Sequence, residues 1–310
     1  MPSEFPIFEP LSIEHREHIE TIAAQFDPYS DFNFTSLFSW NTAGSVATCM
    51  LNGNLVIRFE DYVTGKPFYS FLGTNDASGT SATLLAHMEK EGIRPEIKLL
   101  PSSSLGNIHP EKFLVTEDPD NHDYVLSIER LLTFSGSRLK PNRNLVTRFL
   151  KSYASETRTL DLSDPSMCKT LTDFFLEWAR RKNLPESHTK NEFRAMSRAL
   201  ELSTTRALIG LGVYVDGALV GFTISERLHG AYGMLHFEKA DPTRCVGIYQ
   251  FLMRETAKIL AVTGCELLNY QQDLGLQGLK TCKRGFHPSH YLRKYRVAWI
   301  DAPDRATISP

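Results

Sequence analysis

The chain has 310 residues, a formal net charge of −2, 42% hydrophobic residues and 23% charged residues, which is typical of a globular protein with buried cores. Its first ten residues contain acids and prolines where a signal peptide has positive charge, and no segment supplies the roughly 18 apolar residues of a spanning helix. We therefore expect a soluble, cytoplasmic protein of two domains, without stable membrane insertion.

The cysteine and histidine pattern argues against disulfides and metal. The five cysteines form no Cys-x-x-Cys pair and their number is odd, so we interpret them as reduced structural thiols. His287 and His290 lack the further ligands that a metal site needs. No metal centre is predicted.

The first half of the chain predicts a mixed α/β unit. A helix is expected over residues 12–26. Alternating apolar and polar residues over 46–59, interrupted by Asn52-Gly53, predict a hairpin, because this dipeptide tolerates the positive φ of a tight turn. A strand over 68–72 and a helix over 80–91 follow.

The second half repeats this order. The expected elements are a helix over 165–181 capped by Ser163 or Asp164, a helix over 190–202, strands 207–215 and 218–226 joined at Asp216-Gly217, a strand over 231–238, a helix over 247–262 and a strand over 265–270.

The two hairpins indicate an internal duplication. The segment Cys49–Val56 aligns with Val213–Val220, and the strands that follow each hairpin align at nearly the same offset. The joint is expected near residues 135–141, where Ser-Gly-Ser and a proline interrupt the pattern. This divides the chain into domains 1–137 and 138–310.

Basic residues are concentrated in two segments that contain no acid. Residues 131–155 hold Arg138, Lys140, Arg143, Arg148 and Lys151, and residues 279–299 hold Lys280, Lys283, Arg284, Arg293, Lys294 and Arg296. Two interpretations are open: solvated faces of an ordinary surface, or a local positive field for a phosphate-bearing partner.

A family resemblance lies in the same part of the chain. The run Asn269–Leu279 (Asn-x-x-Gln-Asp-Leu-Gly-x-x-Gly-Leu), with Phe286-His-Pro288 and Leu292–Tyr295 after it, resembles bacterial proteins related to the C-terminal catalytic domain of phosphatidylglycerol lysyltransferase. Residues 31–40 and 139–144 resemble the same family. The resemblance implies two tandem acyltransferase domains of the GNAT-like (N-acetyltransferase) fold, an α/β (α+β) class of mixed sheets flanked by helices, with the active site in the second.

The resemblance also bears on the acyl donor. In acetyltransferases of this fold, the turn before one helix carries Gln/Arg-x-x-Gly-x-Gly/Ala, whose N–H groups bind the coenzyme A pyrophosphate. Here Arg244 and Gly247 match, but Tyr249 replaces the small residue and should crowd the backbone approach. Gly247 to Gln250 instead resemble relatives that take their acyl group from a charged tRNA. We predict aminoacyl-tRNA as donor substrate and no bound cofactor; a coenzyme A thioester is the alternative.

Carboxylates at predicted strand ends are the candidate catalytic groups. Glu238 and Asp273 are predicted to be catalytic, since a carboxylate can accept a proton from an amine nucleophile, and Asp241 is predicted to bind substrate. Strand alternation places His236 and Glu238 on one face. The alternatives are ion pairing for Glu238 or Asp241 and loop capping for Asp273.

Other polar groups complete the predicted site. Carboxamides offer donors and acceptors together, so Asn269, Gln271 and Gln272 are expected to hold the amino and carbonyl groups of an amino acid, beside Tyr249 and Gln250. A tRNA or coenzyme A phosphate is assigned to Arg143, Arg244, Gly247, Lys280, Lys283 and Arg284.

The predicted reaction is aminoacyl transfer from aminoacyl-tRNA, through its acceptor end, to an amine or hydroxyl of a small molecule or peptide. Two alternatives stay open: an acyl-CoA-dependent N-acyltransferase, and a non-catalytic duplicate of the fold that binds RNA or a ligand. The amino acid, the acceptor and the oligomeric state are not specified by the sequence.

Overall fold

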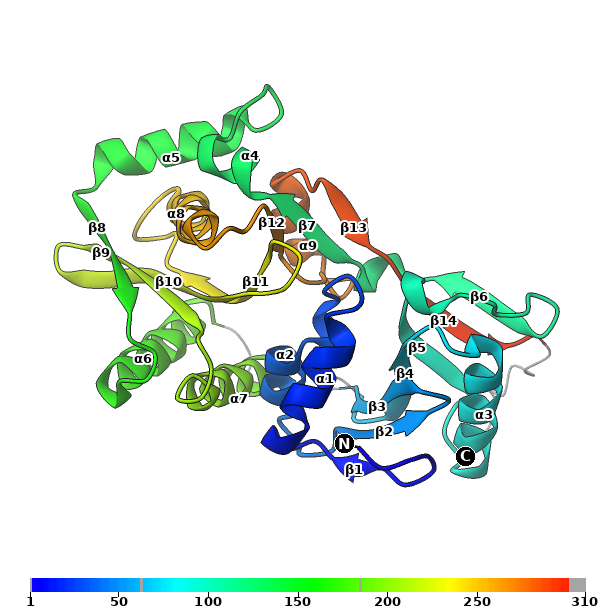
Figure 1. The fold of residues 1–310 in the computed structure, drawn as a ribbon. Coiled ribbons are helices and arrows are strands. Elements are labelled where there is room, and N and C mark those ends of the chain that lie inside the picture. The colour runs from blue at the N-terminus through cyan, green and yellow to red at the C-terminus, as the bar shows by residue number, and fades with distance from the viewer. Residues whose placement is uncertain (1, 62–63, 184–185, 301–310) are drawn as a thin grey trace. The chain divides into compact units, whose positions relative to one another are not determined.

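The computed structural model describes residues 2–61, 64–183 and 186–300 (Figure 1). The chain forms two compact units that do not coincide with its two halves. Unit 1 consists of Met1–Phe34, Ala43–His122 and Leu292–Pro310. Unit 2 consists of Thr35–Thr42 and Asp123–Tyr291.

Unit 1 contains two sheets and a long helix. Its elements are β1 (Glu9–Pro10), α1 (Arg16–Ala23), β2 (Ala47–Leu51), β3 (Asn54–Glu60), β4 (Pro67–Leu72), α3 (Ala77–Lys90), β5 (Glu96–Pro101), β6 (Phe113–Glu117) and β14 (Lys294–Trp299). The strand orders are β1-β2-β3-β4 and β5-β14-β6. Side chains of α3, among them Leu84, Leu85 and Met88, pack against both sheets in one core.

Unit 2 is built on one seven-stranded sheet. Its elements are α2 (Phe34–Trp40, which begins at the last residue of unit 1), β7 (Asp123–Ser127), α4 (Ile128–Thr133), α5 (Lys140–Ser152), β8 (Ser155–Leu160), α6 (Pro165–Arg181), α7 (Glu186–Leu202), β9 (Ile209–Val215), β10 (Ala218–Arg227), β11 (Tyr232–Ala240), α8 (Ile248–Val262), β12 (Leu267–Asn269), α9 (Gln277–Gly285) and β13 (His290–Leu292). The strand order is β13-β7-β12-β11-β10-β9-β8.

The two units repeat one order of elements along the chain, although β5 begins a separate sheet in unit 1 whereas β12 pairs with β11 in unit 2. Four antiparallel strands, a helix and a fifth strand recur as β1-β2-β3-β4-α3-β5 and as β8-β9-β10-β11-α8-β12. Beyond the fifth strand lie two more: β14 and β6 in unit 1, and β7 and β13 in unit 2. The strand that pairs with the fifth strand is β14 in unit 1 and β7 in unit 2. Each of these two strands comes from the opposite half of the chain.

This exchange explains why the units differ from the division at residue 137 expected from the sequence. Strand β7 lies before residue 137 but pairs with β12 of unit 2, and β14 lies at the far end of the chain but pairs with β5 and β6 of unit 1. Pairing between strands far apart in sequence leaves no local signal, so Ser-Gly-Ser and Pro141 marked a loop and a helix start instead.

Most of the local predictions are confirmed. Both hairpins turn at the expected dipeptides, with φ of 53° and 76° at Asn52 and Gly53 and of 50° and 75° at Asp216 and Gly217. Helix α6 has the predicted bounds, and Asp164 caps it by accepting a hydrogen bond from Ser166 N. Strands β1, β5 to β8, β13 and β14 and helices α2, α4, α5 and α9 were not among the predicted elements.

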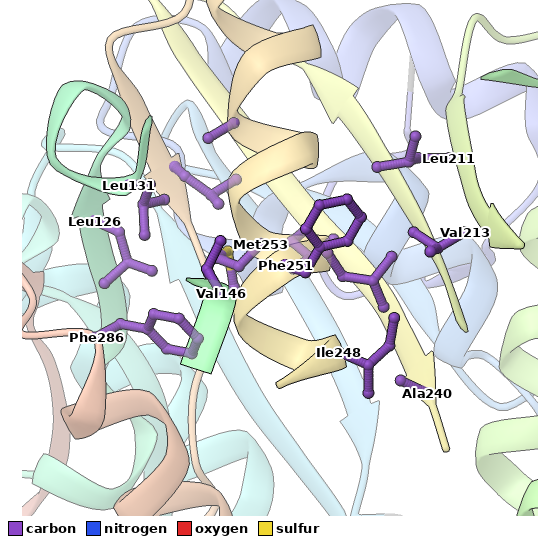
Figure 2. Close-up of a cluster of buried hydrophobic side chains, with 14 of the residues drawn as sticks. Leu126, Leu131, Val146, Leu211, Val213, Ala240, Ile248, Phe251, Met253 and Phe286 are labelled. Carbon is purple, nitrogen blue, oxygen red and sulfur yellow. The ribbon is translucent and has the colours of Figure 1, made fainter. Parts of the chain in front are cut away.

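The sheet of unit 2 is buried on both faces. One face packs against α4, α5 and α8, and Figure 2 shows side chains of this core, including Leu131, Val146 and Phe251. The other face packs against α6 and α7 through residues such as Phe175, Met196 and Phe237. Helix α5 contributes Val146 and Phe149 to the core and leaves its charged residues outside.

A bulge in β11 corrects one expectation. Ile224 pairs with Phe237 but the next residue, Ser225, pairs with Leu235, so His236 is an extra residue on β11. Such a bulge reverses the alternation of side chains. His236 and Glu238 therefore do not share surroundings: the His236 ring lies 3.0 Å from Glu226 Oε1, whereas Glu238 bonds to Tyr270.

Candidate active site

The candidate site lies where two parallel strands of unit 2 separate. Strands β11 and β12 pair only from Tyr232 with Leu267 to Met234 with Asn269, although β11 continues to Ala240. Beyond that ladder, side chains bridge the gap: Gln271 Nε2 donates to Leu235 O at 2.8 Å. The crevice beyond separating parallel strands is the usual ligand site of such sheets.

Glu238 lies in this gap with one oxygen free. The Tyr270 hydroxyl donates to Glu238 Oε2 at 2.7 Å. Glu238 Oε1 is buried and accepts no hydrogen bond from any described residue. Burial raises the pKa of the Glu238 carboxyl to about 7, although the Tyr270 hydroxyl and the ammonium groups of Lys283 and Lys239 act in the opposite direction. A carboxyl with these properties can exchange a proton at neutral pH.

Lys283 lies under this pair and is buried. Its Nζ donates to Tyr270 O, lies 3.4 Å from Gln271 O and is 4.2 Å from the centre of the Tyr270 ring. Burial lowers the Lys283 pKa to about 8. The ammonium of Lys283 therefore holds the chain after β12 in place, and its predicted contact with phosphate stays a prediction.

Asp273 is fully buried and bonded within the protein. The Tyr124 hydroxyl donates to Oδ2 at 2.5 Å, and Gly275 N donates to Oδ1 at 2.9 Å. The Tyr124 phenol also interacts with the Arg284 guanidinium, whose pKa rises as a result. These contacts match loop capping, the alternative interpretation of Asp273. The hydrogen bond between Tyr270 and Glu238 does not involve Asp273.

The carboxamides mainly shape the loop after β12. Asn269 is fully buried, donates to Asp123 Oδ2 at 3.1 Å and accepts from Gln271 N at 2.7 Å. Gln271 adopts a φ of 59° and bonds to β11 as described above. Gln272 is half-buried beside them. The structure therefore brings Gln271 to the gap and places Asn269 behind it.

The turn before α8 is held by protein contacts. Asp241 accepts from Thr243 N at 3.1 Å and Arg244 N at 3.2 Å and forms an ion pair with Arg181, so it caps this turn. Gly247 has a φ of 87°, and a Cβ there would lie 2.3 Å from Leu145 O of α5. The glycine is thus required by a left-handed backbone and by the close approach of α5.

Tyr249 and Gln250 begin α8. The Tyr249 hydroxyl donates to Ala240 O at 3.2 Å, and its ring packs against the core. Burial raises the pKa of this phenol. The Gln250 side chain is half-buried and has no hydrogen-bond partner in the described part of the chain. Gln250 is therefore available to a ligand, whereas Tyr249 fills the space at the end of β11.

The remaining residues predicted to contact phosphate lie on several elements of unit 2. Arg143 donates to Phe134 O at 2.6 Å and so holds the connection between α4 and α5. Arg244 is exposed and forms no side-chain bond among the described residues. Lys280 and Arg284 lie on α9, whose C-terminal end contacts the N-terminal turn of α5, because Asn142 Nδ2 donates to Gly285 O at 2.9 Å.

Three residues of the site were not predicted from the sequence. Tyr270 bonds Glu238, Tyr124 bonds Asp273, and Cys282 lies close enough to interact with the Tyr270 hydroxyl. Although part of Cys282 is exposed, its thiol lies on the buried side, and this burial raises its pKa. Tyr270 follows the last residue of β12, which was the one available signal. Tyr124 lies on β7, and its role depends on the exchanged strand.

No group of three or more metal-ligating side chains occurs among residues 2–61, 64–183 and 186–300. Over the same residues, every helix is too short or too polar to cross a lipid bilayer.

Solved structures share this architecture. A conserved protein of unknown function from Bacteroides thetaiotaomicron VPI-5482 is 26% identical, with a TM-score of 0.83 over 94% of this chain and 99% of that one. The C-terminal domain of a putative lysylphosphatidylglycerol synthetase from Agrobacterium fabrum is 13% identical, with a TM-score of 0.64 over 92% and 91%. A tandem GNAT protein from the clavulanic acid biosynthesis pathway is 11% identical, with a TM-score of 0.50 over 98% and 99%.

The repeated order of elements and these likenesses define the fold class: the chain has a tandem GNAT-like fold. The family model for "Phosphatidylglycerol lysyltransferase, C-terminal" matches residues 24–298. The chain belongs to this family, as its sequence motifs predicted.

One curated relative is an uncharacterized protein of Mycoplasmoides gallisepticum, 23% identical over 179 residues. The match covers 57% of this chain and 56% of the relative, so the chain spans little more than half of that protein's length.

Proposed function

We propose that this protein transfers an aminoacyl group from aminoacyl-tRNA to an amine or hydroxyl acceptor, with Glu238 as general base. The observation that carries the proposal is the buried, unpaired Oε1 of Glu238 at the gap between β11 and β12, on a carboxyl whose pKa is raised to about 7. A group with this pKa is half-ionised near neutral pH, where proton transfer from an amine is most effective.

The reaction needs no group beyond the two substrates and the carboxylate. Glu238 accepts a proton from the acceptor amine as the nitrogen attacks the ester carbonyl carbon of the donor. The C–N bond forms, the C–O bond to the terminal ribose breaks, and the ribose hydroxyl leaves with the proton held by Glu238. Glu238 is then ionised again. Holding ester and amine together supplies much of the acceleration.

Tyr270 acts as the positioning residue for this base. Its hydroxyl fixes Glu238 Oε2, which leaves Oε1 as the oxygen that meets the acceptor. The same hydrogen bond stabilises the ionised carboxylate and lowers its pKa. A base that is held in one orientation reaches the reactive geometry without further ordering.

Two features favour a tRNA donor over coenzyme A. Leu145 of α5 closely approaches Gly247, the glycine of the turn where a pyrophosphate would bind, and Tyr249 occupies the place of the small residue in the coenzyme A motif. The outer face of α5 instead presents Lys140, Arg148 and Lys151 to solvent. Exposed cations on one helix suit a polyphosphate backbone. The family name, a lysyltransferase, supports an aminoacyl group.

The test uses the full chain with labelled aminoacyl-tRNAs or labelled acetyl-CoA as donor and glycinamide as a simple amine acceptor. We expect transfer from an aminoacyl-tRNA. Glu238→Gln should lower the rate roughly 10²- to 10⁴-fold, because it removes the base without changing size. The matched control is Glu266→Gln, which neutralises an exposed carboxylate of the same unit and should keep full activity.

Stability distinguishes lost chemistry from lost folding. Since burial raises the Glu238 pKa from 4.5 to about 7, the wild type gains stability below pH 4.5 and loses it as the pH rises to about 7. Glu238→Gln should therefore be at least as stable as the wild type at pH 8. If transfer occurs only from acetyl-CoA, the proposed donor is wrong. If Glu238→Gln keeps full activity, Glu238 is not the general base.

Tyr270→Phe gives a separate readout through pH. Without the hydroxyl, the pKa of Glu238 should rise, so the acid limb of the rate profile should move to higher pH. The rate on the alkaline plateau should fall less than the rate at low pH. A profile that keeps its wild-type midpoint would mean that Tyr270 is only a packing residue.

A further inference from the structure

Unit 1 contains a surface pocket, open to solvent and called the cavity below, that the transfer reaction does not use. Its volume is about 440 Å³, within the roughly 300–1,000 Å³ of small-molecule sites. Its lining comes from the N-terminal segment, strands β2, β3 and β4, the residues before β2 and helix α3. All lining residues fall within the ranges of unit 1, so the cavity belongs to that unit alone.

One wall carries a cation and an anion that both act on one phenol hydroxyl. The Tyr69 hydroxyl donates to Glu91 Oε2 at 2.7 Å. The Arg58 guanidinium acts on the same hydroxyl, and it also donates to Ser45 O at 3.4 Å. Burial and the Glu91 carboxylate raise the pKa of the Tyr69 phenol. Tyr69 therefore remains a neutral donor that holds the carboxylate in place.

A buried ring nitrogen beside Tyr69 and Glu91 has no hydrogen bond within the described part of the chain. His87 Nε2 is buried and has no hydrogen-bond partner among the described residues; the nearest carboxylate oxygen, Glu91 Oε1, is 3.4 Å away. A buried polar atom without a partner costs free energy and is unusual in a folded protein. A ligand with a polar group at this place would satisfy it.

Aromatic rings form the adjoining wall. Phe8 stacks on His87 with ring centres 6.0 Å apart and planes 20° apart, and it lies 5.3 Å from the Tyr69 ring. Ring faces attract ammonium groups and cover aliphatic carbon. A carboxylate, a guanidinium and aromatic rings thus line one space.

We propose that this cavity binds a small zwitterion, a free amino acid or a short peptide. The ammonium group pairs with Glu91 beside the rings, and the carboxylate pairs with Arg58. A ligand with only an amine leaves Arg58 uncompensated, and a ligand with only a carboxylate meets Glu91, so each alone binds less well. The proposal does not depend on Glu238 or on the reaction in unit 2.

The experiment titrates the full chain with L-lysine, L-alanine and L-alanyl-L-alanine as zwitterions, n-butylamine as the amine alone and propionate as the carboxylate alone. Isothermal calorimetry gives the affinity, and amide NMR shifts locate the site near Ser45 to Ala47. At least one zwitterion should bind more tightly than both single-charge probes. Arg58→Gln and Glu91→Gln should each weaken it roughly ten- to hundred-fold, as expected for a charge-assisted hydrogen bond.

Lys90→Gln and Glu89→Gln are the matched controls, since both side chains are exposed on α3 outside the cavity. They should leave the affinity unchanged. The proposal fails if no zwitterion binds, if butylamine or propionate binds as tightly, or if the controls weaken binding as much as Arg58→Gln and Glu91→Gln do.

Discussion

The two acid-free basic segments look alike in sequence but have different surroundings in the structure. In the first, Arg138, Lys140, Arg148 and Lys151 are exposed, and none of these side chains forms an ion pair or hydrogen bond within the described residues. All but Arg138 lie on α5, whose opposite face is buried through Val146 and Phe149. This segment therefore presents a field of positive charge to solvent.

The second segment uses much of its charge inside the protein. Lys283 is buried under Tyr270, and Lys294 is fully buried in unit 1, where it forms an ion pair with Asp31. Arg296 lies 3.9 Å from Glu96 and 3.8 Å from Asp118. The absence of acids nearby in the sequence says little here, because the compensating acids and carbonyls come from other parts of the chain.

The comparison teaches that a basic run in the sequence does not by itself show which of its cations are exposed. The exposed cations of α5 should act on phosphate and contribute little to folding, whereas the buried Lys283 and Lys294 should contribute to folding and its pH dependence. Two single variants and one triple variant test this division.

Lys294→Met should have the largest effect. Removing one partner of a buried ion pair costs about 3 to 5 kcal/mol of unfolding free energy. Chemical denaturation measures this loss. Arg293→Met, at an exposed neighbour whose guanidinium is 3.8 Å from Glu117, should cost about 1 kcal/mol or less. Equal losses in the two variants would contradict the distinction between buried and exposed charge.

Lys283→Met should change how stability depends on pH. The folded pKa of Lys283 is lowered from 10.5 to about 8, so its contribution is fully present above pH 10.5 and is lost as the pH falls to about 8. The wild type should lose about 3 kcal/mol across this window relative to Lys283→Met. Unfolding at several pH values measures the difference. A constant difference would mean that Lys283 is not desolvated; Lys280→Met serves as the comparison on the same helix.

Neutralising α5 should have the smallest effect on folding. The triple variant Lys140→Gln, Arg148→Gln, Lys151→Gln should change the unfolding free energy by about 0.5 kcal/mol or less per position, as surface substitutions usually do. Its tRNA affinity should fall, and the slope of log affinity against log salt should decrease by about 2 to 3, about one for each phosphate that the variant no longer neutralises.

The triple variant Lys169→Gln, Arg180→Gln, Lys182→Gln on and after α6 is the control, since these cations are also exposed on unit 2. It should keep the wild-type salt slope. If both triple variants lower the slope equally, the charge on α5 has no special role in RNA binding.

Much of the local structure followed from the sequence. The Asn52-Gly53 and Asp216-Gly217 turns, the apolar stripe of α6 and its Asp164 cap depend on residues within a few positions of one another, so their signals are local. The family also followed, because its motifs are continuous runs of residues.

The candidate site followed only in part. Glu238 was found as a carboxylate at a strand end, and the structure adds its buried free oxygen. Tyr270 and Tyr124 were missed as partners, and Asp241 and Asp273 form capping contacts. The bulge at His236 changed which side chains share a face, and no residue type in β11 announces it.

By itself, then, the sequence determined the two hairpins, helix α6 with its cap, and the family, because periodicity, turn residues and motifs act over short distances. Tertiary structure alone decided that β7 and β14 exchange between the units, and that Lys283 and Lys294 are buried while Lys140, Arg148 and Lys151 of α5 stay exposed. The physical reason is that the pairing of a strand, and the free energy of a charge, depend on partners that folding brings from distant positions.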